Sequence, residues 1–246
     1  MRHNTQQLTL IALRHLFVIL FLLFSFGSFA QDEQLPVAPP TITGDPLPAK
    51  KQYYLLSPRI SVTVPHPMGN KSFKKSFVGI YEVSGGLNIL VHKGLFIGAT
   101  AKNGLLKITE NKITDYNASM KINNVAGKFG FDTYVGEKNR TIFSMALSYG
   151  QNWTSYEGIK YKDENNKPKL NSFTTSYWEP EMNIFFLIEA NFGVGATISY
   201  TVFDAHFDPY DLVLNEYAKF GTDNAVSTQF FSFGFGFYYS MIKKKK

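Results

Sequence analysis

The chain has 246 residues, a formal net charge of +6 and 16% aromatic residues, including 23 Phe and 14 Tyr. Charged residues make up 18% of the chain, below the roughly 25% of average soluble domains. The mean hydropathy of -0.12 excludes a bundle of membrane-spanning helices. The last four residues are lysines, so the positive balance is weak evidence for nucleic-acid binding. The absence of cysteine excludes disulfides, thiolate metal sites and lipid attachment to cysteine.

Residues 1–30 have the features of a secretory signal peptide. Arg2 and Arg14 precede an apolar run over residues 16–26, and small residues follow at Ser28 and Ala30. This arrangement predicts cleavage after Ala30; a membrane anchor is the alternative, for which the apolar run is short. Residues 31–52 contain five prolines and no apolar periodicity. We expect an extended periplasmic linker there, or else a segment that docks a partner.

From residue 53 onward, segments in which apolar and polar residues alternate recur along the chain. Successive side chains of a β-strand point to opposite faces, so this alternation predicts strands with one apolar and one polar face. The predicted strands cover residues 56–64, 77–91, 95–106, 120–135, 141–156, 172–188, 192–202 and 227–242. The last strand is the most regular, because large apolar residues occupy every second position from Phe231 to Met241.

The connections between these strands alternate in length. Those after the second, fourth and sixth strands are a few residues long, whereas residues 65–76, 107–119, 157–171 and 203–226 are longer and polar. A membrane barrel with short periplasmic turns and long external loops has this pattern. The predicted fold class is therefore all-β: an antiparallel eight-stranded transmembrane up-and-down barrel over residues 53–242, followed by a basic tail at residues 243–246. A soluble periplasmic sandwich is the alternative.

The signal ending at Ala30, the chain length, the alternating connections and the aromatic C-terminal strand resemble small eight-stranded outer-membrane barrels. The Bacteroidota outer-membrane β-barrel families are the most similar in style. The resemblance covers about residues 53–242. It implies an outer-membrane location, contact with membrane lipid and lipopolysaccharide, recognition by the barrel-insertion machinery and a monomer. Such barrels usually end on an aromatic residue that the insertion machinery recognises, whereas here four lysines follow Met241 and Ile242. A strictly terminal signal is therefore absent, or else Phe237 and Tyr239 take that role.

The two faces of the predicted strands give two sets of candidate residues. Seven charged residues fall on the polar faces: Arg59, Glu82, Lys102, Lys128, Asp132, Glu179 and Glu181. An eight-stranded barrel is only wide enough to be filled by side chains, so we predict paired networks in the lumen, with an ion or proton path as the alternative. The residues predicted to face lipid are Phe231, Phe233, Phe235, Phe237 and Tyr239.

Histidines raise the question of catalysis. Asp204, His206, Asp208 and Asp211 begin the last long connection, and His66 is expected at the same rim. A carboxylate beside a histidine could activate water or a serine. However, the sequence has no nucleophile elbow and no zinc-site spacing. We therefore expect no catalytic residue, no metal and no cofactor.

The expected role is in envelope structure, adhesion or surface recognition through the external loops. A lipid-modifying hydrolase or acyltransferase at the rim, or a narrow channel, is the alternative. Lys71, Lys74 and Lys75 could meet lipopolysaccharide phosphates or belong to a solvated rim. Trp153 and Trp178 suit the aromatic girdle at the membrane interface.

Overall fold

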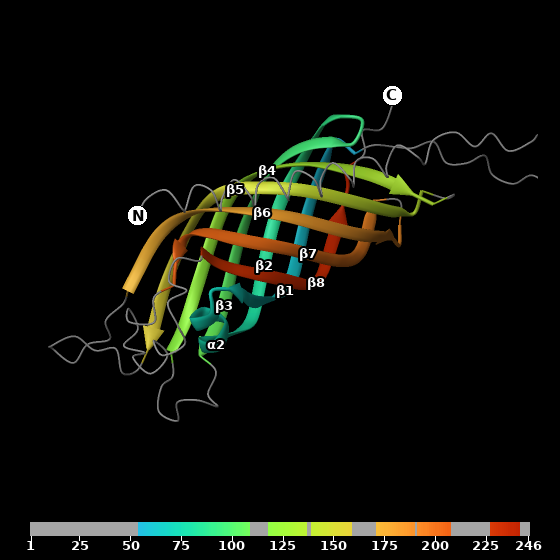
Figure 1. Cartoon of the computed structure of the whole chain (residues 1–246). Coiled ribbons are helices and arrows are strands. Elements are labelled where there is room, and N and C mark those ends of the chain that lie inside the picture. Colours follow the sequence, from blue (N-terminus) through green and yellow to red (C-terminus); the bar gives the residue numbers. More distant parts are fainter. Residues whose placement is uncertain are drawn as a thin grey trace, which may run out of the picture. The chain divides into compact units, whose positions relative to one another are not determined.

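The structure, a computed structural model, describes residues 54–108, 118–136, 139–158, 171–189, 191–207 and 227–241. They form a closed antiparallel barrel of eight strands, in which β8 pairs with β1 (Figure 1). The strands are β1 (Leu56–Gly69), β2 (Phe77–His92), β3 (Leu95–Ile108), β4 (Ala118–Val135), β5 (Thr141–Gly158), β6 (Asn171–Leu187), β7 (Phe192–His206) and β8 (Ser227–Tyr239). The predicted all-β, eight-stranded antiparallel barrel is confirmed.

The predicted signal peptide, linker and basic tail lie outside the described residues, as do most of the last three long connections. Within the described ranges, no helix is long and apolar enough to cross a membrane. We call the end of the barrel that carries the long connections the loop end, and the opposite end the turn end.

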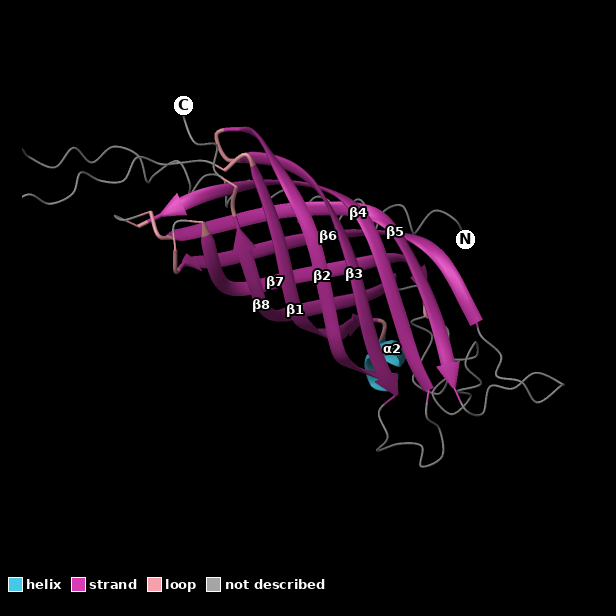
Figure 2. Cartoon of the chain, turned by 180° about the vertical axis from the view of Figure 1, so that it is seen from behind, coloured by secondary structure: helices cyan, strands magenta, loops and turns pink. Residues whose placement is uncertain are grey.

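The strands are strongly tilted (Figures 1 and 2). The directly paired residues, taken strand by strand from Pro58 on β1 through β2 to β8, form a path around the barrel that returns to β1 at Met68. Met68 is ten residues nearer the loop end than Pro58. A stagger of that size over eight strands corresponds to a tilt of about 40°, from ~3.3 Å per residue and ~4.8 Å between strands. On each successive strand from β1 to β8, the directly paired residue therefore lies nearer the loop end by the length of about one and a quarter residues.

The turn between β2 and β3 shows why the short connections can be so tight. It consists of Lys93 and Gly94, whose φ angles are 34° and 99°. Positive φ at both central residues is the requirement of a type I′ hairpin turn. A Cβ on Gly94 would also collide with the backbone oxygen of Asp132 and the ring of Phe131, so glycine is needed at this position.

The first long connection differs from the prediction, which made residues 65–76 a loop. β1 continues to Gly69, pairing with β8 over its whole extension but with β2 only as far as Thr63. Pro65 and Pro67 lie in this extension. Proline is tolerated in a strand where its missing N–H faces no partner, which is why it occurs at strand edges.

A short helix, α2 (Lys71–Ser76), follows and lies beside β1 and β2 at the loop end (Figure 2). Asn70 caps it: the side-chain oxygen accepts a hydrogen bond from the Phe73 N–H at 3.0 Å, and its amide donates to the Phe207 carbonyl at 3.1 Å. Asparagine is a favoured N-cap residue. The cap thus joins α2 to the end of β7.

The outer surface has a polar ring near the loop end. Once the tilt is taken into account, outward polar side chains on six strands lie at about the same height: His66, Asn103, Asn123, Gln151, Ser176 and Gln229. Between this polar ring and the turn end, outward side chains are predominantly apolar. Exposed members include Ile60, Leu87, Ile97, Phe129, Leu147 and Phe235. This apolar band covers about ten residues of each strand, or ~25 Å along the barrel axis.

The inward and outward faces exchange character beyond the polar ring. On β4, Lys121 and Asn123 point outward, whereas Met120 and Ile122 are buried inside the barrel. Closer to the turn end, Asn124 points inward and the outward positions become apolar. The inside of the barrel is therefore apolar at the loop end. Where the outside is apolar, the inside carries polar and charged side chains together with a smaller buried cluster near the turn end, formed by Tyr54, Ile142, Phe185 and Tyr238.

Candidate functional site

The candidate site is the interior of the barrel, where the structure places all seven charged residues expected in the lumen. Each of them is at most 9% exposed. They form three groups at successive heights inside the apolar band.

The group nearest the turn end is built around the ion pair between Arg59 and Asp132. Arg59 Nη1 also donates to Ser144 Oγ at 2.7 Å, and the Tyr54 hydroxyl donates to Asp132 Oδ2 at 2.5 Å. Both charges thus have partners on other segments of the chain.

Three aromatic rings surround the Arg59 guanidinium. Its central carbon lies 5.1 Å from the ring centroid of Phe96, 5.3 Å from Tyr238 and 5.6 Å from Phe185. A cation over a ring face is attracted by the ring quadrupole, and more strongly when both are desolvated. Gly130 makes room for one of these rings, because a Cβ there would collide with Phe96.

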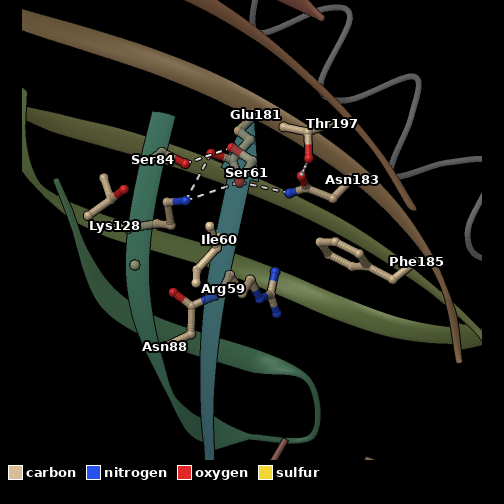
Figure 3. A pocket seen from close by; sticks show the side chains of 12 residues that line it. Arg59, Ile60, Ser61, Ser84, Asn88, Lys128, Glu181, Asn183, Phe185 and Thr197 are labelled. Carbon is tan, nitrogen blue, oxygen red and sulfur yellow. Dashed lines mark hydrogen bonds and ion pairs between the residues drawn. The ribbon is translucent and has the colours of Figure 1, made fainter. Parts of the chain in front are cut away.

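The second group joins Lys128 to Glu181 with Nζ–Oε distances of 3.0 and 2.9 Å. Asn183 donates to Glu181 at 2.7 Å and accepts from Thr197 Oγ1 at 2.7 Å (Figure 3). Beside these residues lies a cavity of about 10 Å³, which Arg59 also lines, and a cavity of that size has room for about one water.

The third group places Lys102 between two carboxylates. Its Nζ lies 2.6 Å from Glu179 Oε1 and 3.3 Å from Glu82 Oε1. Thr63 donates to Glu82 at 3.1 Å and Thr201 to Glu179 at 2.6 Å. Of the seven charged groups four are carboxylates and three are cations, so formally one carboxylate is in excess, and it belongs to this group.

An apolar plug that the strand pattern did not predict fills the loop end of the barrel. Its buried members are Phe73, Phe77, Leu106, Ile108, Met120, Ile122, Ala126, Tyr156, Tyr177, Phe203, Phe207 and Phe230. Phe73, on α2, is central: its ring centroid lies 5.1 Å from that of Phe230 and 5.4 Å from those of Phe77 and Phe207. α2 thus seals the barrel instead of belonging to a polar loop.

The aromatic residues predicted to face lipid all lie on the outer surface of β8. The exposed row consists of Phe231, Phe233, Phe235, Phe237 and Tyr239, with Phe235 the most exposed at 71%. Small inward residues such as Gly234 and Gly236 alternate with them, and they keep β8 close to the neighbouring strands. The two faces of the strand are therefore opposite in character.

The histidines are not brought into one site. His66 is exposed on β1 opposite Phe231, and His206 lies at the end of β7 opposite Ser227. These two partners are four residues apart on β8, or about 13 Å. Asp204 is exposed, and Asp208 and Asp211 lie outside the described residues. In the described ranges, no group of three or more His, Cys, Asp or Glu residues could hold a metal ion.

No protein-family model matches the sequence, and a comparison with curated proteins found no match. Similar solved structures include Neisserial surface protein A, at 10% identity, 76% coverage of this chain, 97% of that chain and a TM-score of 0.46. For the attachment invasion locus protein Ail of Yersinia pestis the values are 11%, 75%, 97% and 0.41. For the outer membrane protein OprG from Pseudomonas aeruginosa they are 9%, 77%, 98% and 0.38. Likenesses this distant say nothing about function. The eight-stranded barrel fold follows from the chain's own closed strand pairing, and membership of a Bacteroidota family stays a prediction.

Proposed function

We propose that this protein is an outer-membrane β-barrel without enzymatic activity, which acts in envelope structure, adhesion or surface recognition through its loop end. The observation that carries the proposal is the apolar band around a filled, ion-paired interior. Exposed apolar patches on soluble monomers seldom exceed a few hundred Å². A band that encircles the barrel and leaves Phe235 71% exposed suits hydrocarbon as its solvent.

The dimensions of the band support a membrane-spanning position. Its height of ~25 Å equals the apolar band of transmembrane barrels, which is flanked by aromatic girdles. Tyr81, Trp178 and Tyr200 lie at its margin towards the loop end, directly below or within the polar ring. Short turns face the periplasm in such barrels, so the loop end faces outward.

The filled interior supports an anchor in preference to a conduit. Ion pairs occupy three successive heights, the cavity among them holds about one water, and the apolar plug closes the loop end. We expect planar-bilayer recordings of the purified protein to show no conductance steps. Regular steps would contradict the proposal and favour a channel.

Two lysine substitutions on the outer face of β1 test the membrane position. Ile60 lies near the middle of the band and is 55% exposed, whereas His66 lies in the polar ring. In a bilayer, Ile60→Lys should cost about 2–4 kcal/mol of folding free energy and His66→Lys about 0–1 kcal/mol. Urea titration in phosphatidylcholine vesicles measures both. Equal costs for the two variants would refute the placement.

The same region tests the absence of enzymatic activity. His66→Ala and His206→Ala remove the two histidines of the loop end, and lipid A and phospholipid turnover can be assayed in cells that express each variant. We expect the turnover to equal that of the wild type, because the two histidines are far apart. A loss of turnover in either variant would favour a rim hydrolase or acyltransferase.

A further inference from the structure

We propose that the outer face of β3–β6 beyond the polar ring, centred on Trp153, is a contact surface for the saccharide headgroup of lipopolysaccharide in the surrounding leaflet. The inference rests on the proposed function, because it requires the loop end to face outward. It assigns the expected contact with lipopolysaccharide to the saccharide headgroup and to one face of the barrel.

The position of Trp153 motivates the proposal. Its side chain is 46% exposed and points outward from β5, two residues past Gln151 of the polar ring. That step corresponds to about 5 Å along the barrel axis. Trp153 therefore lies above the apolar band, at the height where lipid headgroups replace acyl chains.

The cross-strand neighbours of Trp153 are polar. Asn123 on β4 and Thr174 on β6 lie directly opposite, and both are exposed. An interfacial anchor would be expected to continue the apolar band, as Trp178 does at its margin. A large ring flanked by an amide and a hydroxyl instead matches a sugar, which offers an apolar ring face and polar edges.

Hydrogen bonds along the sheet hold the flanking amides in place. Tyr81 donates to Asn103 Oδ1 at 3.4 Å, and Asn103 Nδ2 donates to Asn123 Oδ1 at 2.8 Å. On the other side Gln151 Nε2 donates to Ser176 Oγ at 3.4 Å. Side chains fixed on rigid strands bind with less loss of conformational entropy.

The charge of this face suits a phosphorylated saccharide. Lys107 and Lys121 point outward from β3 and β4 past the polar ring. Lys121 Nζ lies 2.7 Å from Glu157, with both side chains more than 40% exposed. The Glu157 carboxylate offsets the charge of Lys121, so Lys107 leaves this face with one net positive charge among these three residues. A lysine ammonium is a common partner of phosphate groups. The aromatic ring, the amides and these lysines thus form one surface.

Single-tryptophan variants test the proposal, because the protein has only two tryptophans. Trp178→Phe leaves Trp153 as the reporter, and Trp153→Phe leaves Trp178 as the matched control. Each full-length variant is reconstituted in vesicles of phosphatidylcholine, of lipopolysaccharide with its core saccharide, and of lipid A without core sugars. Acrylamide quenching of fluorescence measures how far water reaches each ring.

We expect Trp178 to be shielded in all three vesicles. Trp153 should be quenched strongly in phosphatidylcholine and lipid A, and severalfold less with the core saccharide. With the core saccharide present, Asn123→Ala should make Trp153 about fivefold more accessible to acrylamide than in the Trp178→Phe variant alone. This value assumes that the hydrogen bond from the Asn123 amide to the sugar contributes about the usual energy of a hydrogen bond.

Each contrary outcome has a definite meaning. If Trp153 is shielded in phosphatidylcholine as well as Trp178 is, it is an interfacial anchor and the saccharide surface is refuted. If lipid A alone shields it, the contact is with phosphate and acyl groups, which also refutes the proposal. If both rings are quenched freely in every vesicle, the protein does not insert, and the proposed function itself fails.

Discussion

The buried ion pair between Arg59 and Asp132 offers the sharpest test of the interior. Arg59→Met leaves a carboxylate that is 1% exposed, with the Tyr54 hydroxyl as its remaining donor. Among the described residues, Asp132 Oδ1 has no hydrogen-bond partner even in the intact protein, so few groups can compensate for the lost guanidinium. Removing one partner of a buried pair typically costs about 3–5 kcal/mol, and we expect a value in the upper half of that range.

Asp132→Leu should be costly for the corresponding reason, because Arg59 keeps its rings and Ser144 but loses its counterion. The double variant should cost less than either single one, since apolar residues can replace a buried pair without leaving a charge. Urea titration in phosphatidylcholine vesicles, followed by tryptophan fluorescence and by gel migration before and after boiling, measures all three.

The matched control is the pair of Lys121 and Glu157, which has a distance of 2.7 Å but side chains that are 49% and 43% exposed. Lys121→Met should change stability by about 0–1 kcal/mol. If Arg59→Met costs no more than this control, water reaches the interior pair. The account of a dry, filled lumen would then be wrong, and a conducting interior would regain support.

Two further comparisons use the same titration. Lys102→Met should destabilise the barrel more than Lys128→Met, because it leaves two carboxylates without their cation instead of one. Equal costs would contradict the pairing of Lys102 with both Glu82 and Glu179. Gly130→Ala should cost about 1–3 kcal/mol, because its Cβ would collide with Phe96, whereas Gly127→Ala on the outer face of the same strand meets nothing within 4 Å and should be nearly neutral. Similar effects at the two glycines would mean that the interior yields easily.

The strand pattern was predictable within the apolar band because outward and inward residues differ in polarity there. On β4, Val125, Phe129 and Phe131 alternate with Lys128 and other polar residues, and a period of two follows directly from strand geometry. The seven inward charges could be identified from that alternation alone.

The partners of those charges could not be predicted. Lys128 on β4 pairs with Glu181 on β6, two strands away, and their heights match only because of the ten-residue stagger around the barrel. The stagger is fixed by the closure of β8 on β1. No local feature of the sequence encodes this register, because it depends on contacts between residues far apart in the chain.

The apolar plug left a signal that was overlooked. The adjacent polar residues Asn123 and Asn124 mark the point on β4 where the apolar positions change face. On β3, Leu105 and Leu106 similarly place two large apolar residues in succession. The predicted strands 95–106 and 120–135 include both steps, but the change of face within them was not predicted. Residues 107–119 were predicted to form a loop, whereas β3 continues to Ile108 and β4 begins at Ala118.

The change of face indicates that different interactions stabilise the apolar band and the loop end of the barrel. In the proposed membrane position the outside of the band is hydrocarbon, so moving apolar groups inward gains little there, and hydrogen-bonded pairs occupy the lumen. Beyond the polar ring the proposed surroundings are aqueous, so burial of the plug gains the hydrophobic effect. Phe73→Ala should therefore cost about 3–5 kcal/mol, with the same value in detergent micelles and in vesicles, because its ring is fully buried and contacts no lipid. A cost of Phe73→Ala that differed between detergent micelles and vesicles would mean that the plug lies within the bilayer, and the proposed membrane boundary would be wrong.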